Sequence, residues 1–550
     1  MHSKRWSCGG TTTRQYAREV ASGRRGRPVR RGVCRVAAAL VLLAAAVSGC
    51  AEGQTAAVKM PDDPGVVRTA AGAVRGTVAD DHRYFAGIPY AAPPLGALRW
   101  QSPAPVESWA GFRDATRPGA RCIQDTSSDV DRRPPSEDCL TLNVWTPPPS
   151  DEPRPVMVWV HGGSFLNGSG DIYPARRLAG RGVVVVTINY RLGALGFLAH
   201  PAWGSGGDVG NYGLADQQAA LRWVRDNIAG FGGDPDRVTI AGESAGGMAV
   251  CDHLVAPGSR GLFSAAIIQS APCQAQYDLP AAQEASTAYA ADVGCADPRV
   301  AADCLRSLPA DRLAAPLTYA RFGTERLSGP VAGTEALPEK SFAAITSGEA
   351  ARVPVMIGTT QDEHTLFAAL QALRGRTFDA ANYSGLLAEA FGPHGSAVAA
   401  RYPPERYGGN VALAYSAAVT AAEYACVADR MADALSDQPV YAYEFGDRDA
   451  PAPEPLLEAP FPVGAAHSLE LRYLFDVGGA PPLDLAQQRL SEEMVDYWAR
   501  FVAAGSPGPG WPELTSGPAG ERMWLEPDGS RVITDFEQKH QCAFWAGLGS

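Results

Sequence analysis

Short apolar runs separated by polar or helix-forming segments recur along residues 150–450. Runs of four to six residues are typical of strands buried on both faces of a sheet. Between two of them, Leu214, Leu221, Val224 and Ile228 share one face of a helix that stops at Gly230. Strands alternating with helices favour a mostly parallel sheet covered on both faces. The strand candidates are residues 155–160, 183–188, 238–241, 265–269, 353–358 and 440–445.

The segments outside this pattern predict small strands or helical insertions. Residues 66–115 combine short apolar stretches with several glycines and prolines, which is consistent with small strands and loops. Residues 280–350 and 365–435 are Ala-rich and helical, without strong strands. We expect them to be insertions at one end of the sheet, as a lid or pocket wall. Because α/β enzymes often keep one large sheet with long insertions, we predict a single domain over residues 65–550.

The N-terminus has the features of a bacterial targeting segment. Residues 1–35 carry ten Lys or Arg and one acid, and residues 36–47 form an apolar run. The run ends Val47-Ser48-Gly49-Cys50, which resembles a lipobox. We predict a lipoprotein signal peptide over residues 1–49, a lipidated Cys50 and a tether over residues 50–64. The mature protein would then be extracytoplasmic, anchored to the membrane by lipid alone or secreted. An ordinary secretory signal with an incidental Cys is the alternative.

Charge and metal-ligand spacing exclude some classes of partner. Residues 1–49 hold ten of the 48 basic and one of the 59 acidic residues, so the remainder carries a net charge of about −20. Such an acidic chain is not expected to bind nucleic acid. No Cys pair has the two-residue spacing of a zinc knuckle, so neither a metal nor a cofactor is expected. These features leave the oligomeric state open.

The most informative motif is Gly242-Glu243-Ser244-Ala245-Gly246, which follows an apolar run and precedes a potential helix. A strand, sharp turn and helix would expose the Ser244 hydroxyl at the carboxyl edge of the sheet. A serine in a glycine-rich turn is often only a turn residue, so catalysis requires further groups. A second strand end, residues 158–160, is followed by His161-Gly162-Gly163-Ser164-Phe165. Its backbone N–H groups could bind the oxyanion of an acyl-transfer reaction.

A catalytic serine also needs a base and an acid that orients the base. Where the serine stands in a strand–turn–helix motif of this kind, both residues come later in the chain. His467 stands out because it lies on a loop, Gly464-Ala465-Ala466-His467, after a proline-rich stretch. For the acid, either Asp362 or Glu363 could serve, because both follow the strand 353–358. The residues alone do not choose between them. The other candidate histidines are His364, His394 and His540.

Together these motifs resemble the type-B carboxylesterase family, over nearly all of residues 66–545. The resemblance implies an α/β-hydrolase fold, with a large mostly parallel sheet flanked by helices and helical insertions. It implies a serine carboxylic-ester hydrolase that acts on small-molecule esters through an acyl-enzyme. The matching stretches are residues 85–91, 136–144, 161–165, 189–191, 231–247 and 464–470.

The resemblance also implies roles for individual residues. The catalytic triad would be Ser244, Glu363 and His467. The oxyanion would be bound by the N–H groups of Gly163, Ser164 and Ala245. The chain departs from the family pattern at two positions, because His364 and Ser164 each stand where a glycine is usual.

Eight cysteines remain once the signal segment and the predicted lipidated Cys50 are set aside, an even number that indicates disulfides in an exported protein. The resemblance implies the pairs Cys122–Cys139, Cys295–Cys304 and Cys426–Cys542, which leaves Cys251–Cys273.

Two other functions have to be weighed. An amide, carbamate or lactone hydrolase could use the same site. A non-catalytic, cholinesterase-like binding protein is the alternative of a different class, but such a protein has no need of a complete triad. Choline esters are not expected, because residues 123–138 lack the aromatic residue that binds the choline cation in cholinesterases.

Overall fold

The computed structural model describes residues 63–125, 133–204, 206–322, 325–514 and 520–548. Asp62–Ser550 groups into one compact unit. The predicted signal peptide, Cys50 and nearly all of the tether lie outside the described residues.

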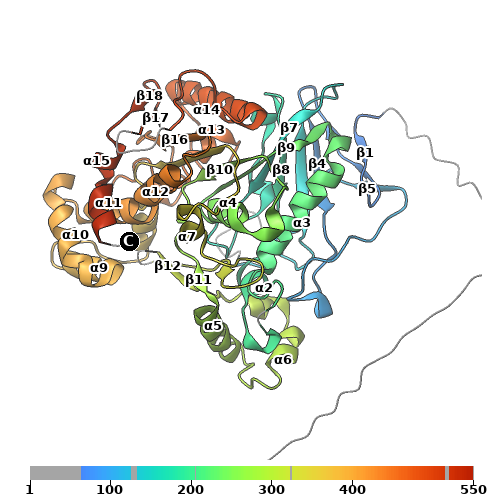
Figure 1. Ribbon diagram of the computed structural model, residues 1–550, viewed down its shortest axis with the longest axis horizontal. Coiled ribbons are helices and arrows are strands. Elements are labelled where there is room, and N and C mark those ends of the chain that lie inside the picture. The colour runs from blue at the N-terminus through green and yellow to red at the C-terminus, as the bar shows by residue number, and fades with distance from the viewer. Residues whose placement is uncertain (1–62, 126–132, 205, 323–324, 515–519, 549–550) are drawn as a thin grey trace, which may run out of the picture. The chain divides into compact units, whose positions relative to one another are not determined.

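An eleven-stranded sheet forms the centre of this unit (Figure 1). Its strands are β3 (Thr77–Val78), β4 (Arg83–Pro89), β6 (Thr141–Thr146), β7 (Arg154–Val160), β8 (Val184–Ile188), β9 (Gly233–Glu243), β10 (Ala265–Gln269), β15 (Val355–Thr360), β16 (Val440–Phe445), β17 (Arg522–Leu525) and β18 (Arg531–Ile533). Their order is β18-β17-β16-β15-β10-β9-β7-β8-β6-β4-β3. The run from β17 to β8 is parallel, whereas both edges of the sheet are antiparallel. All six predicted strands are present, and the α/β fold is confirmed.

The central strands are apolar throughout because successive side chains enter two different cores. In β7, Val156, Val158 and Val160 belong to the core that also contains Leu221 and Met248. Met157 and Trp159 point the other way, into the core that contains Trp498. The first core lies under α3 (Tyr212–Asn227) and α4 (Ala245–Val255), and the second under α1 (Arg176–Ala179) and α14 (Leu485–Ala504). Burial on both faces explains why a period-2 alternation of polar residues is missing.

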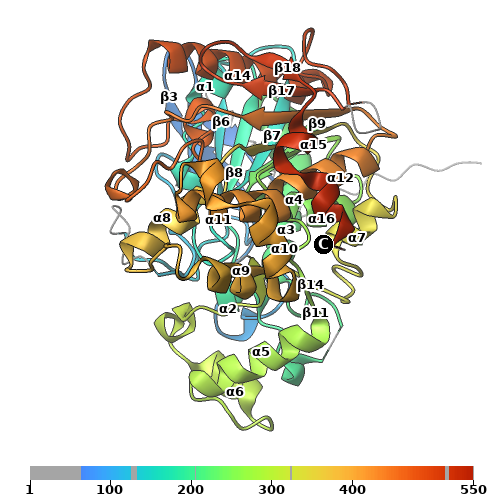
Figure 2. The ribbon, with the colours of Figure 1, turned by 90° about the vertical axis from the view of Figure 1, so that its left-hand side faces the viewer.

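The two long insertions are mainly helical. The first contains α5 (Leu279–Asp292), α6 (Ala301–Ser307) and α7 (Ser341–Thr346). Two short ladders join it, β11 (Tyr277–Asp278) with β14 (Val331–Ala332) and β12 (Ala320–Phe322) with β13 (Glu325–Leu327). The second contains α8 (Thr365–Leu373), α9 (Tyr383–Phe391), α10 (Gly395–Arg401), α11 (Val411–Thr420), a π-helical turn (Ala421–Ala425) and α12 (Cys426–Ala434). In both views α5 and α6 lie at the end of this unit opposite α14 (Figure 2).

Short elements complete the described chain. The predicted small strands of the N-terminal region are present as β1 (Val66–Arg68), β2 (Ala73–Arg75) and β5 (Phe112–Asp114), which pair in a separate three-stranded sheet. The remaining α-helices are α2 (Gly193–Phe197), α13 (Leu471–Leu474), α15 (Phe536–His540) and α16 (Cys542–Gly547). One helical stretch, Val411–Ala434, is long and apolar enough to cross a membrane, but 78% of its most apolar window is buried in this fold.

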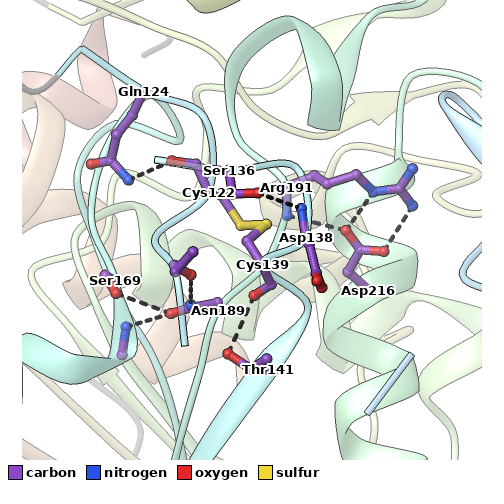
Figure 3. Close-up of a disulfide and its surroundings, with 12 residues drawn as sticks. Cys122, Gln124, Ser136, Asp138, Cys139, Thr141, Ser169, Asn189, Arg191 and Asp216 are labelled. Atoms are coloured by element: carbon purple, nitrogen blue, oxygen red, sulfur yellow. Dashed lines mark hydrogen bonds and ion pairs between the residues drawn. A yellow bond between two sulfur atoms is a disulfide. The ribbon is translucent and has the colours of Figure 1, made fainter. Parts of the chain in front are cut away.

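All eight described cysteines form disulfides, in the pairs Cys122–Cys139, Cys251–Cys273, Cys295–Cys304 and Cys426–Cys542. Figure 3 shows the first pair beside the buried ion pair of Arg191 and Asp216, whose two N–O distances are both 2.7 Å. Asn189 lies on the other side of this disulfide and accepts hydrogen bonds from Ser169 Oγ and Gly170 N. The Cys122–Cys139 disulfide therefore lies among hydrogen bonds and an ion pair that hold the loops after β7 and β8 in place.

The Cys426–Cys542 disulfide is expected to contribute most to stability, because it joins residues 116 apart. Both cysteines lie in a small core formed by α9 to α11 with Trp545 of α16. In the loop-entropy account the bond is worth roughly 4 to 5 kcal/mol. We expect Cys426→Ala/Cys542→Ala to lower the free energy of unfolding by up to this amount, and Cys295→Ala/Cys304→Ala, which opens a loop of only 9 residues, to lower it less. Urea denaturation measures both, and equal losses would contradict the expectation.

Candidate active site

Ser244 lies in a strained turn between β9 and α4. Its backbone has φ 56° and ψ −122°, a conformation that costs free energy for any residue with a side chain. The Ser244 N–H donates to Gln269 O at 2.9 Å, which ties the turn to β10. Ser244 is partly exposed, whereas its neighbours from Gly242 to Gly247 are buried. The turn therefore presents one hydroxyl group at the carboxyl edge of the sheet.

The two glycines of the motif are required by the close packing of this turn. A Cβ atom at Gly242 would lie 2.4 Å from Gly246 O, and one at Gly246 would lie 2.0 Å from Val160 O. Gly162, at the end of the neighbouring strand, has the same constraint, because a Cβ atom there would lie 2.8 Å from Glu243 O. The Gly-x-Ser-x-Gly motif and the His-Gly-Gly loop thus pack directly against each other.

The loop after β7 carries two of the three predicted oxyanion donors, Gly163 N and Ser164 N, whereas the third, Ala245 N, lies at the start of α4. Gly163 and Ser164 have φ values of 107° and 57°, so the chain turns sharply at both residues. Within the described chain, no hydrogen bond is found from the N–H groups of Gly163, Ser164 or Ala245 to another residue. Tyr190 supports the loop, since its hydroxyl donates to His161 O at 2.8 Å and its ring stacks on the His161 ring. Serine fits at position 164, but its positive φ is one that glycine adopts more easily.

The loops that follow β15 and β16 bring Glu363 and His467 together. His467 Nδ1 lies 2.6 Å from Glu363 Oε2, although the residues are 104 positions apart. Glu363 Oε1 accepts a hydrogen bond from Thr360 N at 2.8 Å, which holds the carboxylate against the end of β15. Both side chains are buried. An acid that holds the Nδ1 side of the ring leaves Nε2 to exchange a proton with another group.

Asp362, the other candidate acid, has a different set of contacts. Its carboxylate accepts two hydrogen bonds from Arg448, both 2.8 Å long, and a third from Ala465 N. Asp362 therefore connects the loop of Glu363 with the loop of His467 without touching the imidazole. Of the other histidines, His394 is exposed and His540 pairs with Glu444 at 2.8 Å.

His364 fits where the family has glycine because this position has an ordinary helical backbone, with φ −75°. Its N–H donates to Thr420 Oγ1 at 3.0 Å. The ring is buried against Phe367 and Tyr415, and neither ring nitrogen has a partner among the described residues. Burial lowers the pKa of His364 to about 3, so this ring is neutral at ordinary pH.

Two further carboxylates lie near His467, and the sequence motifs did not identify them as part of the site. Glu243 Oε1 lies 3.1 Å from His467 Nε2 and accepts a hydrogen bond from Ser468 Oγ at 2.5 Å. Glu470 is buried nearby and accepts from Gln269 Nε2 at 3.1 Å. The sequence did contain a sign that could have identified them: each is a charged residue in a motif whose other residues are mostly apolar or small.

These carboxylates dominate the electrostatics of the site. Burial opposes the charge on His467, but Glu243, Glu363 and Glu470 outweigh burial and raise its pKa to about 9. Burial, together with Glu243 and Glu363, raises the pKa of Glu470 to about 8. Three buried carboxylates around one imidazole cannot all be charged cheaply, and the pKa of Glu243 is raised by its burial as well. In the described part of the chain, no group of three or more His, Cys, Asp or Glu residues is arranged to hold a metal ion.

Comparison with known proteins agrees with this fold over almost the whole described chain. The profile of the carboxylesterase family matches residues 63–545. Fumonisin B1 esterase of Sphingopyxis macrogoltabida is 34% identical over 515 residues, which cover 88% of this chain and 90% of that protein. Para-nitrobenzyl esterase of Bacillus subtilis is 40% identical over 316 residues, covering 55% and 63%. Phenmedipham hydrolase of Pseudarthrobacter oxydans is 34% identical over 486 residues, covering 81% and 92%.

The family match spans all the loops that surround Ser244, and the fold is the one that the sequence predicted. The chain belongs to the carboxylesterase family and is a carboxylic ester hydrolase with the α/β-hydrolase fold.

Proposed function

We propose that the chain hydrolyses esters through an acyl-enzyme on Ser244, with His467 as general base and Glu363 as the acid that orients it. The 2.6 Å contact between Glu363 and His467, formed beside a serine in a strained strand-to-helix turn, is the observation that carries this proposal. A scaffold that only binds a partner has no physical need for either feature.

The chemistry follows from these positions. His467 takes the Ser244 proton as the hydroxyl oxygen attacks the ester carbonyl, and the same imidazolium then protonates the leaving alcohol. Water repeats the two steps on the acyl-enzyme and releases the carboxylic acid. Glu363 keeps a proton on Nδ1 and stabilises the imidazolium. The N–H groups of Gly163, Ser164 and Ala245 would bind the negatively charged oxygen of each tetrahedral intermediate.

His467 Nε2 has to change partner during this cycle. It makes no hydrogen bond in the described chain and lies 3.1 Å from Glu243 Oε1. Apo sites commonly have loose catalytic hydrogen bonds that tighten when substrate binds. We infer that the contact with Glu243 belongs to the free enzyme, and that Nε2 turns to the Ser244 hydroxyl in the substrate complex.

Relatives of similar identity are named for three different compounds: fumonisin B1, para-nitrobenzyl esters and phenmedipham. We propose small neutral esters as substrates, with carbamates, amides and lactones as the alternatives that the same site could attack. A panel of p-nitrophenyl esters of increasing acyl length, with matched carbamate, anilide and lactone compounds, separates these classes by kcat/KM.

The nucleophile is tested by removing it. Ser244→Ala should abolish ester hydrolysis and organophosphate labelling while the protein stays folded. His467→Ala should be about as damaging, because the two residues act as a unit. Kinetics with p-nitrophenyl esters and mass spectrometry of the labelled protein measure both effects, and labelling that persists in Ser244→Ala would refute the assignment.

The acid is tested by a matched pair of neighbours. Glu363→Gln should lower kcat by on the order of 1000-fold or more, because the ring loses the group that fixes its tautomer. Asp362→Asn should cost much less, since Asp362 contacts Arg448 and Ala465 and not the imidazole. His364→Gly should stay active. Loss of activity in His364→Gly, together with an active His467→Ala, would mean that the wrong histidine had been chosen.

The pH dependence follows from the carboxylates around the base. A general base must be neutral, and Glu243 favours the charged form of His467, so activity should rise only as the pH approaches the raised pKa. Glu243→Gln removes that charge and should move the acid limb of kcat/KM to lower pH by about one unit or more. Asp278→Asn, which changes a surface partner of Lys340, is the control and should leave the profile in place. An unmoved limb in Glu243→Gln would contradict the electrostatic account.

We also propose that Cys50 carries a diacylglyceryl group and anchors an extracytoplasmic enzyme, as the residues Val47-Ser48-Gly49-Cys50 suggest. Cys50→Ala should release the enzyme from the membrane fraction, because the lipid on Cys50 is the only membrane anchor proposed for it. Fractionation of cells that express the full chain measures this. Unchanged membrane association would rule out the lipobox.

A further inference from the structure

The long helical stretch Val411–Ala434 is interrupted where it passes the candidate site. Between α11 and α12, residues Ala421–Ala425 form a π-helical turn. Such turns close with i→i+5 hydrogen bonds, are rare, and occur frequently at functional sites. The extra residue rotates everything after the turn relative to an unbroken α-helix.

The side chains at this turn contact both loops that carry the proposed acid and base. Thr420 Oγ1 accepts a hydrogen bond from His364 N, next to Glu363. Four residues later, the ring of Tyr424 lies on the ring of His467, with centroids 5.3 Å apart and planes inclined at 50°. Tyr424 is 1% exposed and His467 is 3% exposed, so the contact is shielded from water.

Residues beyond the turn serve a different part of the fold. Cys426, two positions after Tyr424, is bonded to Cys542 of α16. Met431, further along α12, packs in the core beneath the sheet. Because of the π turn, Tyr424 contacts His467 while the residues that follow it, Cys426 and Met431, contact α16 and the core.

A side chain from outside the helix holds the turn. Gln274 Nε2 donates to Glu423 O at 3.1 Å and to Glu423 Oε2 at 2.7 Å. Gln274 follows Cys273, whose disulfide partner Cys251 lies on α4, the helix that begins after Ser244. Gln274 Oε1 is buried and finds no partner among the described residues, so the contacts of this amide go to Glu423. A half-satisfied buried amide costs free energy, which favours a functional reason for its place.

We propose that Tyr424 is a positioning residue for His467, and that the π turn held by Gln274 sets its place. The proposal rests on the triad assigned above. The tilted contact between the two rings limits the rotation of the imidazole between Glu243 and Ser244. The aromatic face also stabilises the imidazolium that forms when His467 takes the serine proton, as aromatic rings stabilise cations.

Other groups face the same imidazole and must stay unchanged in a test. Glu243, Glu363 and Glu470 act on its charge. Phe367 contacts it at 5.3 Å, and His364 lies beyond Phe367. Substitutions at Tyr424 and Gln274 alter none of these side chains, so a shift in the titration of His467 can be assigned to the turn.

The first test compares Tyr424→Phe with Tyr424→Leu on the full chain, normalised by active-site titration with an organophosphate. Tyr424→Leu should lower kcat about tenfold or more while KM changes less than threefold. Its acid limb should move to lower pH by about half a unit, because the charged imidazole loses an aromatic neighbour. Tyr424→Phe keeps the ring and should stay within about twofold of the parent in kcat. The proposal is overturned if Tyr424→Leu matches the parent, or if Tyr424→Phe falls as far as Tyr424→Leu.

The second test loosens the turn without touching the ring. Gln274→Leu removes both bonds to Glu423 and should shift kcat and the acid limb in the same direction as Tyr424→Leu, by less. Gln276→Leu is the matched control, since Gln276 Nε2 donates to Asp252 at 2.9 Å and not to the turn. It should lower the Tm without moving the acid limb. Equal pH profiles for Gln274→Leu and the parent would overturn the role of Gln274.

The triad itself has a separate outcome. An active His467→Ala would refute the proposed function. An inactive His467→Ala, together with normal Tyr424→Leu and Gln274→Leu enzymes, would refute the positioning role alone.

Discussion

The close packing of two strand ends is the constraint on which the rest of this site depends. Gly246 and Gly162 bring the turn of Ser244 against the loop after β7, at separations that leave no room for a side chain. This approach brings the loop that carries Gly163 and Ser164 against the turn that carries Ser244 and Ala245. It also explains the strained backbone of Ser244, since a relaxed turn would carry the hydroxyl away from the loop.

The second feature of the site is the concentration of negative charge around one imidazole. Burying Glu243, Glu363 and Glu470 together is costly, and His467 offsets part of that cost by carrying a proton. The same arrangement makes the free base less available at neutral pH. The raised pKa makes the imidazole a stronger base, but it leaves a smaller fraction of the ring unprotonated at neutral pH.

The supports for this arrangement lie in the insertions and disulfides more than in the sheet. The acid loop hydrogen-bonds to α11 through Thr420, and the base loop is tied to it through Asp362. The Cys251–Cys273 bond connects the nucleophile helix to the segment that holds the π turn. The helical insertions thus support the loops that carry Glu363 and His467, which lie beyond the ends of the strands.

The sequence alone determined six strands of the central sheet, the serine turn and the glycine-rich loop after residues 158–160, because each depends on neighbours a few positions away. It did not predict β6, β17 or β18 of the same sheet. Buried runs such as residues 238–241 and the glycines of the Gly-x-Ser-x-Gly motif carry their own signal. The short strand pairs β11 with β14 and β12 with β13 were not predicted. Strands of two or three residues are too short to show an alternation of polar and apolar side chains. Choosing Glu363 over Asp362 needed the family resemblance, since both are acids on one loop.

Only the tertiary structure decided that Asp362 turns to Arg448, that Glu243 and Glu470 lie near His467, and that a π turn places Tyr424 against the same ring. Contacts between residues more than 40, and in two cases more than 200, positions apart depend on how the loops cross in space, and local patterns do not encode that.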